Sequence, residues 1–255
     1  SNTALGREAL HTNTTASNNV AVGKRALYLN TTGTTNTAVG QNSLHSNTTA
    51  SDNTAVGAGS LYANLTGASN VAIGRQALAA NTASNNTAVG FESLKANTSG
   101  QNNIAVGSCS LCKNTTGSSN IAIGKVAMCC NTEGENNTAI GHIALRNNTT
   151  ADNNTAVGMS ALTANTTGEK LVAVGALALD ANTTADDNTA VGYCSLSTNT
   201  TGCRNVAMGC GSLKTNLTGD KNTALGHIAL EGNTSADNNT AVGYAALNVN
   251  STGAS

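Results

Sequence analysis

The sequence of 255 residues contains very few of the residues that usually fill a large globular core. Aromatic residues make up 2% of the chain, tryptophan and proline are absent, and Phe91 is the single phenylalanine. Hydrophobic residues reach 39%, but most of them are Ala, Val, Leu and Ile. Such a chain is poorly suited to form the deep, aromatic-lined pocket that is typical of small-molecule sites. We therefore expect that the protein is not an enzyme and uses no cofactor.

Charge is scarce as well. Charged residues make up 10% of the chain, against roughly 25% in an ordinary domain. The 12 basic and 13 acidic residues give a formal net charge of −1. A nucleic-acid binder normally carries a basic footprint, so we expect no nucleic-acid partner. No apolar run approaches the roughly 20 residues that span a bilayer, and we expect no membrane insertion in this segment.

The chain consists of one repeat that occurs fifteen times. A glycine preceded by an Ala-Val-like pair recurs every 17 residues, with a single interval of 16 between Gly74 and Gly90. We number repeat positions from this glycine. Ala occupies position −2 and Asn position +7 in all fifteen repeats, and Leu occupies +4 in all but one, where Met128 replaces it. Self-similarity at a fixed short period is the signature of a solenoid.

The local pattern predicts β-structure. Asn53 to Gly57 reads Asn-Thr-Ala-Val-Gly, which places two β-branched side chains on one face of a strand and Ala on the other. A second short segment, Ser60 to Tyr62, is followed by the turn formers Asn64 to Gly67. Disorder is the alternative for so polar a chain, but random low complexity would not keep four residue types in register. We predict an all-β fold, a β-solenoid or β-roll of fifteen 17-residue coils with two short strands each. Residues 1–255 would form a single continuous array that is a segment of a longer chain.

Stacked coils place identical positions in columns. About three large aliphatic side chains per coil are available for burial, so the core should be thin and subunits should associate. We expect the Ala column at −2 to mark a tight backbone approach, either inside the coil or across a subunit interface; it includes Ala55, Ala72, Ala122, Ala139 and Ala156. The Asn column at +7 should hydrogen bond from coil to coil, as stacked Asn ladders do. Thirteen of its members also lie in glycosylation sequons, which would be used only in a secreted eukaryotic protein: Asn13, Asn30, Asn47, Asn64, Asn97, Asn114, Asn148, Asn165, Asn182, Asn199, Asn216, Asn233 and Asn250.

The repeats resemble those of a known family. Asn70 to Gly74 and Asn120 to Gly124 are similar to the head repeats of YadA-type trimeric autotransporter adhesins. The longer unit from Asn154 to Gly168 is similar to repeats of tail-fibre-like surface proteins. The resemblance covers essentially the whole chain, although the adhesin repeat is shorter. It implies a left-handed β-roll, a homotrimer and an adhesive function.

Three other groups of residues are candidate sites. Cys112 and Cys129 share a column 17 residues apart, so stacking at about 4.8 Å would bring them within disulfide range. The odd total of seven cysteines leaves at least one thiol free or intermolecular. The four His occupy variable columns without a carboxylate or Cys column beside them, and we expect exposed side chains and no metal site. Acidic residues that include Asp152, Asp186 and Asp220 gather before the strand, where solvated turns explain them better than a cation site.

Together these features favour an extracellular structural or adhesive fibre shaft on a cell surface or virion. Its partners would be copies of itself, with a surface receptor or glycan as a further one. The alternative is an ice-binding solenoid that uses paired Thr columns, such as Thr14-Thr15 and Thr31-Thr32. Leu65 and Glu133 interrupt those columns.

Overall fold

The computed structural model describes residues 1–251 and contains fifteen strands of three residues, one in each repeat, with no helix in that range. The chain divides into two compact units, residues 1–133 and 134–255, and each is described by itself. The first unit holds β1 to β8 and the second β9 to β15. The strands are β1 (Thr3–Leu5), β2 (Val20–Val22), β3 (Thr37–Val39), β4 (Thr54–Val56), β5 (Val71–Ile73), β6 (Thr87–Val89), β7 (Ile104–Val106), β8 (Ile121–Ile123), β9 (Thr138–Ile140), β10 (Thr155–Val157), β11 (Val172–Val174), β12 (Thr189–Val191), β13 (Val206–Met208), β14 (Thr223–Leu225) and β15 (Thr240–Val242).

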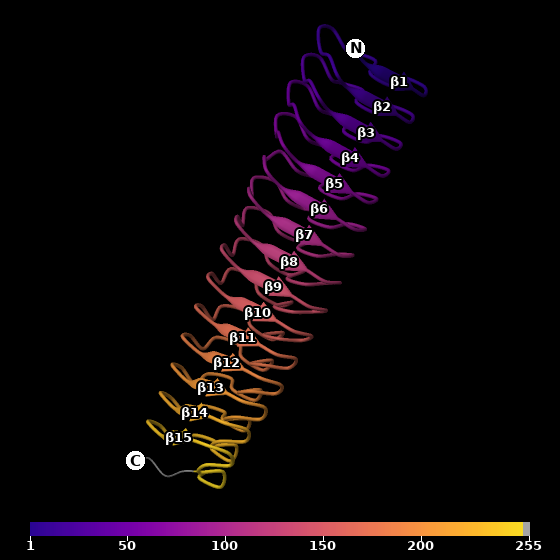
Figure 1. The fold of residues 1–255 in the computed structure, drawn as a ribbon. Helices are drawn as coiled ribbons and strands as arrows, with labels where there is room; N and C mark the ends of the chain where they lie inside the picture. The colour runs from indigo at the N-terminus through magenta and orange to yellow at the C-terminus, as the bar shows by residue number, and fades with distance from the viewer. Residues whose placement is uncertain (252–255) are drawn as a thin grey trace. The chain divides into compact units, whose positions relative to one another are not determined.

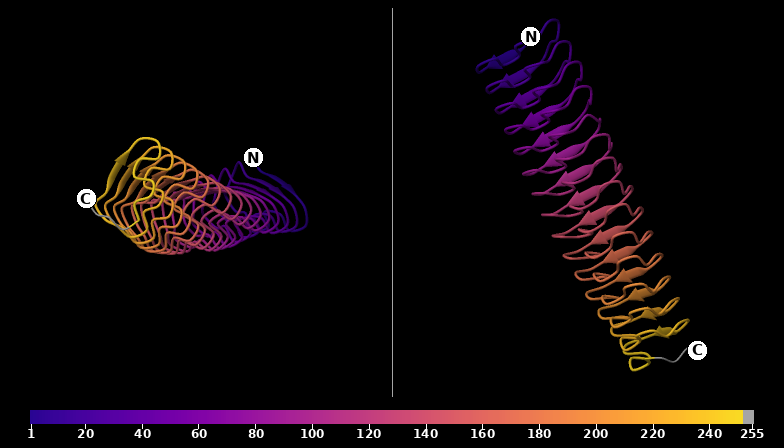
Figure 2. Two further views of the ribbon diagram at one scale, coloured as in Figure 1. Left: turned by 90° about the horizontal axis from the view of Figure 1, so that it is seen from below. Right: turned by 180° about the vertical axis from the view of Figure 1, so that it is seen from behind.

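Within each unit, every strand pairs in parallel with the strand of the next repeat (Figure 1). In the first unit Ala55 lies opposite Ala72, and in the second Ala156 lies opposite Ala173. The rest of each repeat forms the connection that parallel pairing requires, and Figure 2 shows these loops following one another from repeat to repeat within each unit. The predicted all-β solenoid with a 17-residue repeat is therefore confirmed.

The 16-residue interval leaves this register intact. Ala72 pairs with Ala88, and Ala88 pairs with Ala105. The missing residue is absorbed in the turn, where the Asn81 side chain donates to the Ala83 carbonyl oxygen two residues on instead of the usual three (2.7 Å). The sequence predicts that the strands on both sides of the deletion stay in register, because turns tolerate deletions better than paired strands do. The strand pairing confirms this prediction.

The second segment of each coil is not a strand, which corrects the prediction of two strands per coil. Positions +2 and +4 have positive φ, as in Arg25 (56°) and Leu27 (51°). The backbone nevertheless bonds to both neighbouring coils: Arg25 N–H donates to Arg7 O at 3.0 Å, and Leu27 N–H donates to Ser43 O at 3.0 Å. A left-handed Leu costs about 1–2 kcal/mol. The same conformation in every coil keeps these hydrogen bonds in register.

The core is built from small side chains and one large one per coil. Between the terminal repeats, Ala at −2 and Leu or Met at +4 are fully buried, as in Ala55 and Leu61 (both 0% exposed). The aliphatic residues at −3 and −1 turn outward and are half-buried or exposed, for example Ile73 at 40%. The expectation of three large buried aliphatics per coil is therefore wrong, because the strand buries its Ala face and leaves its β-branched face outside.

This orientation decides the role of the Ala column. Ala55, Ala72, Ala122, Ala139 and Ala156 all have 0% exposure inside their coils. The Ala105 carbonyl oxygen accepts a hydrogen bond from Ser93 Oγ at 2.9 Å across the coil interior. The Ala column thus lies inside the coil and not at a subunit interface, and the tight packing itself stays a prediction.

The glycine at position 0 forms the corner after each strand. Gly57 has φ of 132°, and a Cβ placed on it would lie 2.6 Å from the carbonyl carbon and oxygen of Gly74. Only glycine avoids both the backbone strain and this collision, which explains its presence in all fifteen repeats.

Two Asn ladders supply hydrogen bonds inside the coils. At +7, Asn47 Nδ2 donates to Asn30 Oδ1 (2.8 Å) and to the Ala50 carbonyl oxygen (2.9 Å). At −4, Asn70 N–H donates to Asn53 Oδ1 (3.0 Å). Each amide thereby satisfies buried polar groups that would otherwise cost about 1–3 kcal/mol.

The +7 ladder runs through both units. In the second unit, Asn182 Nδ2 donates to Asn165 Oδ1 (3.0 Å) and to the Ala185 carbonyl oxygen (3.1 Å). From Asn30 to Asn233 the column is 0% exposed, whereas Asn13 and Asn250 at its ends are half-buried. A glycan cannot be attached to the buried side chains while the coils are folded. The sequons in the buried part of the column are therefore structural positions.

Candidate functional site

The outer face of the strands is uncharged and mostly aliphatic, with Thr at nine positions. We call the outward residues at −3 and −1 the strand face. All thirty are Thr, Val, Ile, Leu or Met. In the first unit Ile73 and Ile104 are each 40% exposed, and in the second Ile140 is 37% and Met208 43% exposed. Contiguous exposed apolar surface of this kind marks interaction sites in soluble proteins.

Cys112 and Cys129 lie against each other in adjacent coils of the first unit. Their Sγ atoms are 3.1 Å apart, and both are half-buried thiols. The hydrogen bond with Cys129, together with burial, raises the pKa of the Cys112 thiol well above its usual range. The structure thus brings together the pair predicted from sequence. The Cys112–Cys129 disulfide itself stays a prediction.

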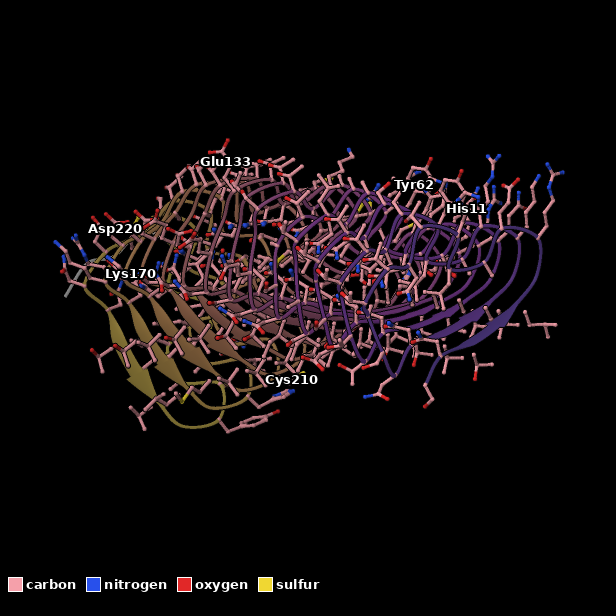
Figure 3. The ribbon with its side chains drawn as sticks, turned by 90° about the horizontal axis from the view of Figure 1, so that it is seen from above. His11, Tyr62, Glu133, Lys170, Cys210 and Asp220 are labelled. Carbon is pink, nitrogen blue, oxygen red and sulfur yellow. The ribbon has the colours of Figure 1, made fainter. Side chains whose placement is uncertain are left out.

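An aromatic row occupies position +5 in the first four repeats. His11, Tyr28, His45 and Tyr62 stack with ring centroids 5.0 to 5.2 Å apart and interplanar angles of 16° to 20°. His11 and Tyr62, its two end members, lie along the same edge of the first unit (Figure 3). Burial lowers the pKa of His45, and the Arg25 charge lowers it further. His11 and His45 are therefore parts of a stack, and the half-buried His45 departs from the expectation of exposed His side chains.

A recess of about 510 Å³ opens where this row ends. It is lined by Gln41, Asn42, Ala58, Gly59, Tyr62, Arg75, Gln76 and Ala79. The next member of the +5 column after Tyr62 is Ala79, whose methyl group cannot cover an aromatic ring. Tyr62 is 42% exposed. The recess thus combines an aromatic ring with amides and a guanidinium, the arrangement of a small-molecule site with a few convergent polar groups.

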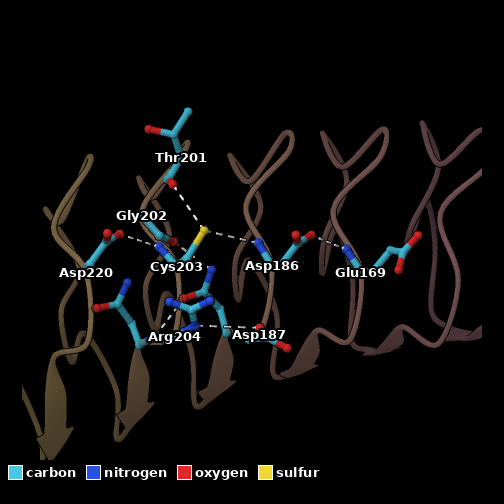
Figure 4. A network of polar contacts seen from close by, with 10 residues as sticks. Glu169, Asp186, Asp187, Thr201, Gly202, Cys203, Arg204 and Asp220 are labelled. Carbon is cyan, nitrogen blue, oxygen red and sulfur yellow. Dashed lines mark hydrogen bonds and ion pairs between the residues drawn. The ribbon is translucent and has the colours of Figure 1, made fainter.

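An acidic column lies at position +11 of the second unit (Figure 4). Asp186 Oδ1 accepts a hydrogen bond from the Glu169 N–H (2.8 Å), and Asp220 Oδ1 accepts one from the Cys203 N–H (2.7 Å). In the first unit Ser51 Oγ accepts the equivalent bond from the Thr34 N–H at 3.0 Å. The carboxylates therefore cap the preceding turn. This agrees with the interpretation of these residues as turn formers.

Over residues 1–251, no group of three or more His, Cys, Asp or Glu side chains is placed to hold a metal ion. The described part of the chain also contains no helix with the length and hydropathy needed to cross a bilayer.

Comparison with known proteins gives no relative. No protein-family model matches the chain, and a search of curated proteins finds no match. The interpretation of the surface therefore depends on the chemistry of the strand face, the thiol pair and the recess.

Sequence reasoning missed the aromatic row and the −4 Asn ladder, although both leave a signal. The four aromatic residues recur every 17 positions. Asn fills −4 in fourteen of fifteen repeats, with Leu171 as the exception. A column-by-column alignment of the repeats would have found both.

Proposed function

We propose that this chain is a shaft segment of a structural or adhesive fibre, in which copies associate laterally through the strand face. The observation that carries the proposal is the uncharged, mostly aliphatic outward surface on β1 to β8 and again on β9 to β15. Burying such surface is worth about 25 cal/mol per Å². The strand face therefore favours a second copy of the same surface over water.

The number of copies follows from the resemblance to trimeric adhesins, which implies a parallel homotrimer. The strand face supports self-association because it repeats the same two columns along each unit, so identical chains can meet in register. The remaining outer columns vary from repeat to repeat, as with Lys24 and Arg25 against Phe91 and Glu92. They would meet a surface receptor or glycan outside the cell.

Charge placed on the strand face tests the proposal. Val106→Glu in the first unit and Val174→Glu in the second should dissociate the assembly, because a carboxylate buried without a partner is strongly unfavourable. Ser108→Glu and Ala176→Glu, each two residues further on and beyond the corner glycine, are matched controls. Sedimentation velocity should give a single-chain mass for the strand-face variants and the wild-type mass for the controls, all with β-type circular dichroism. Assembly unchanged in both strand-face variants would refute the proposal.

An ice-binding solenoid remains the second candidate. It is favoured by the strand face, where Thr fills nine of the fifteen −3 positions beside a −1 aliphatic. The Thr column at +8 suits it less, because Thr31 Oγ1 donates to the Thr48 carbonyl oxygen (3.0 Å) and Thr166 Oγ1 to that of Thr183 (3.0 Å). Those hydroxyl hydrogens are used within the coils. A thermal-hysteresis assay distinguishes the candidates, since a fibre shaft should leave the freezing point of the solution unchanged.

A further inference from the structure

We propose that the recess beside Tyr62 binds an acidic saccharide, with a pyranose ring on the Tyr62 face and a carboxylate on Arg75. The inference rests on the adhesive part of the proposed function and names its ligand class and binding site. It does not depend on self-association, because none of the residues that line the recess belongs to the strand face.

The recess exists because small residues interrupt three columns in adjacent repeats. Ala58 at +1 and Gly59 at +2 follow Gln41 and Asn42 in the same columns, and Ala79 at +5 follows Tyr62. The longer side chains of the neighbouring repeats thus surround the three small residues. The resulting volume of about 510 Å³ lies within the usual range for ligand pockets, roughly 300–1,000 Å³.

Tyr62 offers a flat platform on one side of the recess. One face of its ring is covered by His45 (centroids 5.0 Å apart, 16° between planes). The opposite face looks toward the repeat of Ala79, where the aromatic row has ended. An aromatic face carries partial negative charge, which attracts the polarised C–H bonds on the apolar face of a sugar ring. The rigid stack behind Tyr62 holds this platform in place.

The polar lining suits hydroxyls and one negative charge. Among the contacts of residues 1–251, the side-chain amides of Gln41, Asn42 and Gln76 make no hydrogen bond within the chain. An amide offers both donors and acceptors, as neighbouring sugar hydroxyls require. Arg75 is the charged residue of the lining.

The Arg75 guanidinium is available to a ligand. It lies 5.9 Å from the Phe91 ring centroid and takes part in none of the ion pairs of the described residues. The nearest acidic residue along the +2 column, Glu92, is paired with Lys95 (3.0 Å). Arginine binds a carboxylate through two parallel hydrogen bonds. A uronic-acid residue therefore matches the recess better than a neutral sugar does, and a single guanidinium is too little charge for a nucleic-acid strand.

Titration calorimetry on the whole chain tests the site with two probes. The first is a tetrasaccharide of alternating glucuronic acid and N-acetylglucosamine, and the second is chitotetraose, which has the same number of pyranose rings, an N-acetyl group on each ring and no carboxylate. We expect the acidic probe to bind more tightly. Arg75→Gln should remove that preference while leaving residual binding to both probes.

Ala79→His is the sharpest variant, because it extends the His-Tyr-His-Tyr row and covers the free face of Tyr62. It should fold, since His already occupies this column twice, and should weaken binding of the acidic probe about tenfold or more, which corresponds to about 1.4 kcal/mol. Ala80→His, one residue further on and outside the lining, is the matched control and should bind as the wild type does.

Any of three results would overturn the proposal. One is the absence of binding by the wild-type chain at millimolar probe, and another is equal binding by the Ala79→His variant and its control. Tighter binding of a single-stranded oligonucleotide than of the acidic tetrasaccharide would also contradict it. The sedimentation mass of each variant separates these outcomes from a failure of self-association, because the recess variants should keep the wild-type mass.

Discussion

Residues 1–133 and residues 134–251 each have the same kind of core and differ in their outer columns. In both units the inward positions are Ala at −2, Leu or Met at +4 and Asn at +7. At +11 the first unit carries neutral residues, whereas the second carries carboxylates from Glu135 to Asp237, interrupted by Cys203. The +5 aromatic row and the thiol pair occur in the first unit. The comparison teaches that the inward columns specify the coil, while outward columns can change without altering it.

Overpacking the shared core should have the largest effect, and an equal one in both units. We expect Ala122→Leu and Ala139→Leu each to destabilise the fold by about 3 kcal/mol, because a fully buried Ala has no room for three more carbons. Ala63→Leu and Ala164→Leu, at the half-buried +6 position, are the controls, since that column already accepts Leu29. Chemical denaturation measures the change. Tolerance of both core variants would contradict the internal tight approach.

The repeat made this core predictable. Ala, Gly, Leu and Asn in fixed register required stacked coils, and the deletion before Gly90 could be placed in a turn from sequence alone. Alternation along the strand also placed Ala and its β-branched neighbours on opposite faces. The alternation alone does not show which of the two faces is buried. Hydrophobicity favours burying Val56 over Ala55, but the structure buries Ala55 and Leu61 completely and leaves Val56 half-buried.

The candidate sites were predictable only in part. The column of Cys112 and Cys129 was visible from the spacing. The recess was not, because it depends on three small residues in different columns of adjacent repeats. The positive φ of the +2 and +4 positions was not predictable either. Positive φ is rare for Leu, so no local pattern indicates it.

Oxidation should stabilise the first unit and leave the second unchanged. A Cys112–Cys129 disulfide would close a 17-residue loop in the unfolded chain, worth up to about 3 kcal/mol. Because the Cys112 pKa is raised, its thiolate fraction is small at neutral pH, and the rate of oxidation should increase as pH rises. Peptide mapping without reductant identifies the pair, and Cys112→Ser is the control. Preferential pairing of Cys109 with Cys130 would contradict the geometry.

Asp180, at position +5 in the second unit, should make the stability of that unit depend on pH. Its Oδ1 is buried without a hydrogen-bond partner, and burial raises the pKa of this carboxyl. Since the folded pKa exceeds the unfolded one, ionisation destabilises the fold as pH rises above about 4. Asp180→Asn should therefore stabilise the second unit at neutral pH and have no effect below about pH 3.5. Thermal melts across pH 3 to 7 measure this, and a gain that is independent of pH would contradict it.

The +11 column should show the smallest effect. Asp220→Ser should change stability by less than about 0.5 kcal/mol, because Ser51, Ser84 and Ser118 make the same cap in the first unit. Asp220→Ala removes the acceptor of the Cys203 N–H and should cost about 1 kcal/mol. Hydrogen exchange of the Cys203 amide checks the cap directly. Equal exchange in the Ser and Ala variants would show that the cap is unimportant.

The mass of the folded wild-type chain in solution tests the central claim most directly. Sedimentation velocity at micromolar concentration, under reducing conditions and with β-type circular dichroism verified on the same sample, gives this mass. We predict a stable species of three times the 25.2 kDa chain mass, held together by the strand face. A folded species at 25.2 kDa that persists as the concentration is raised would contradict lateral association through that face.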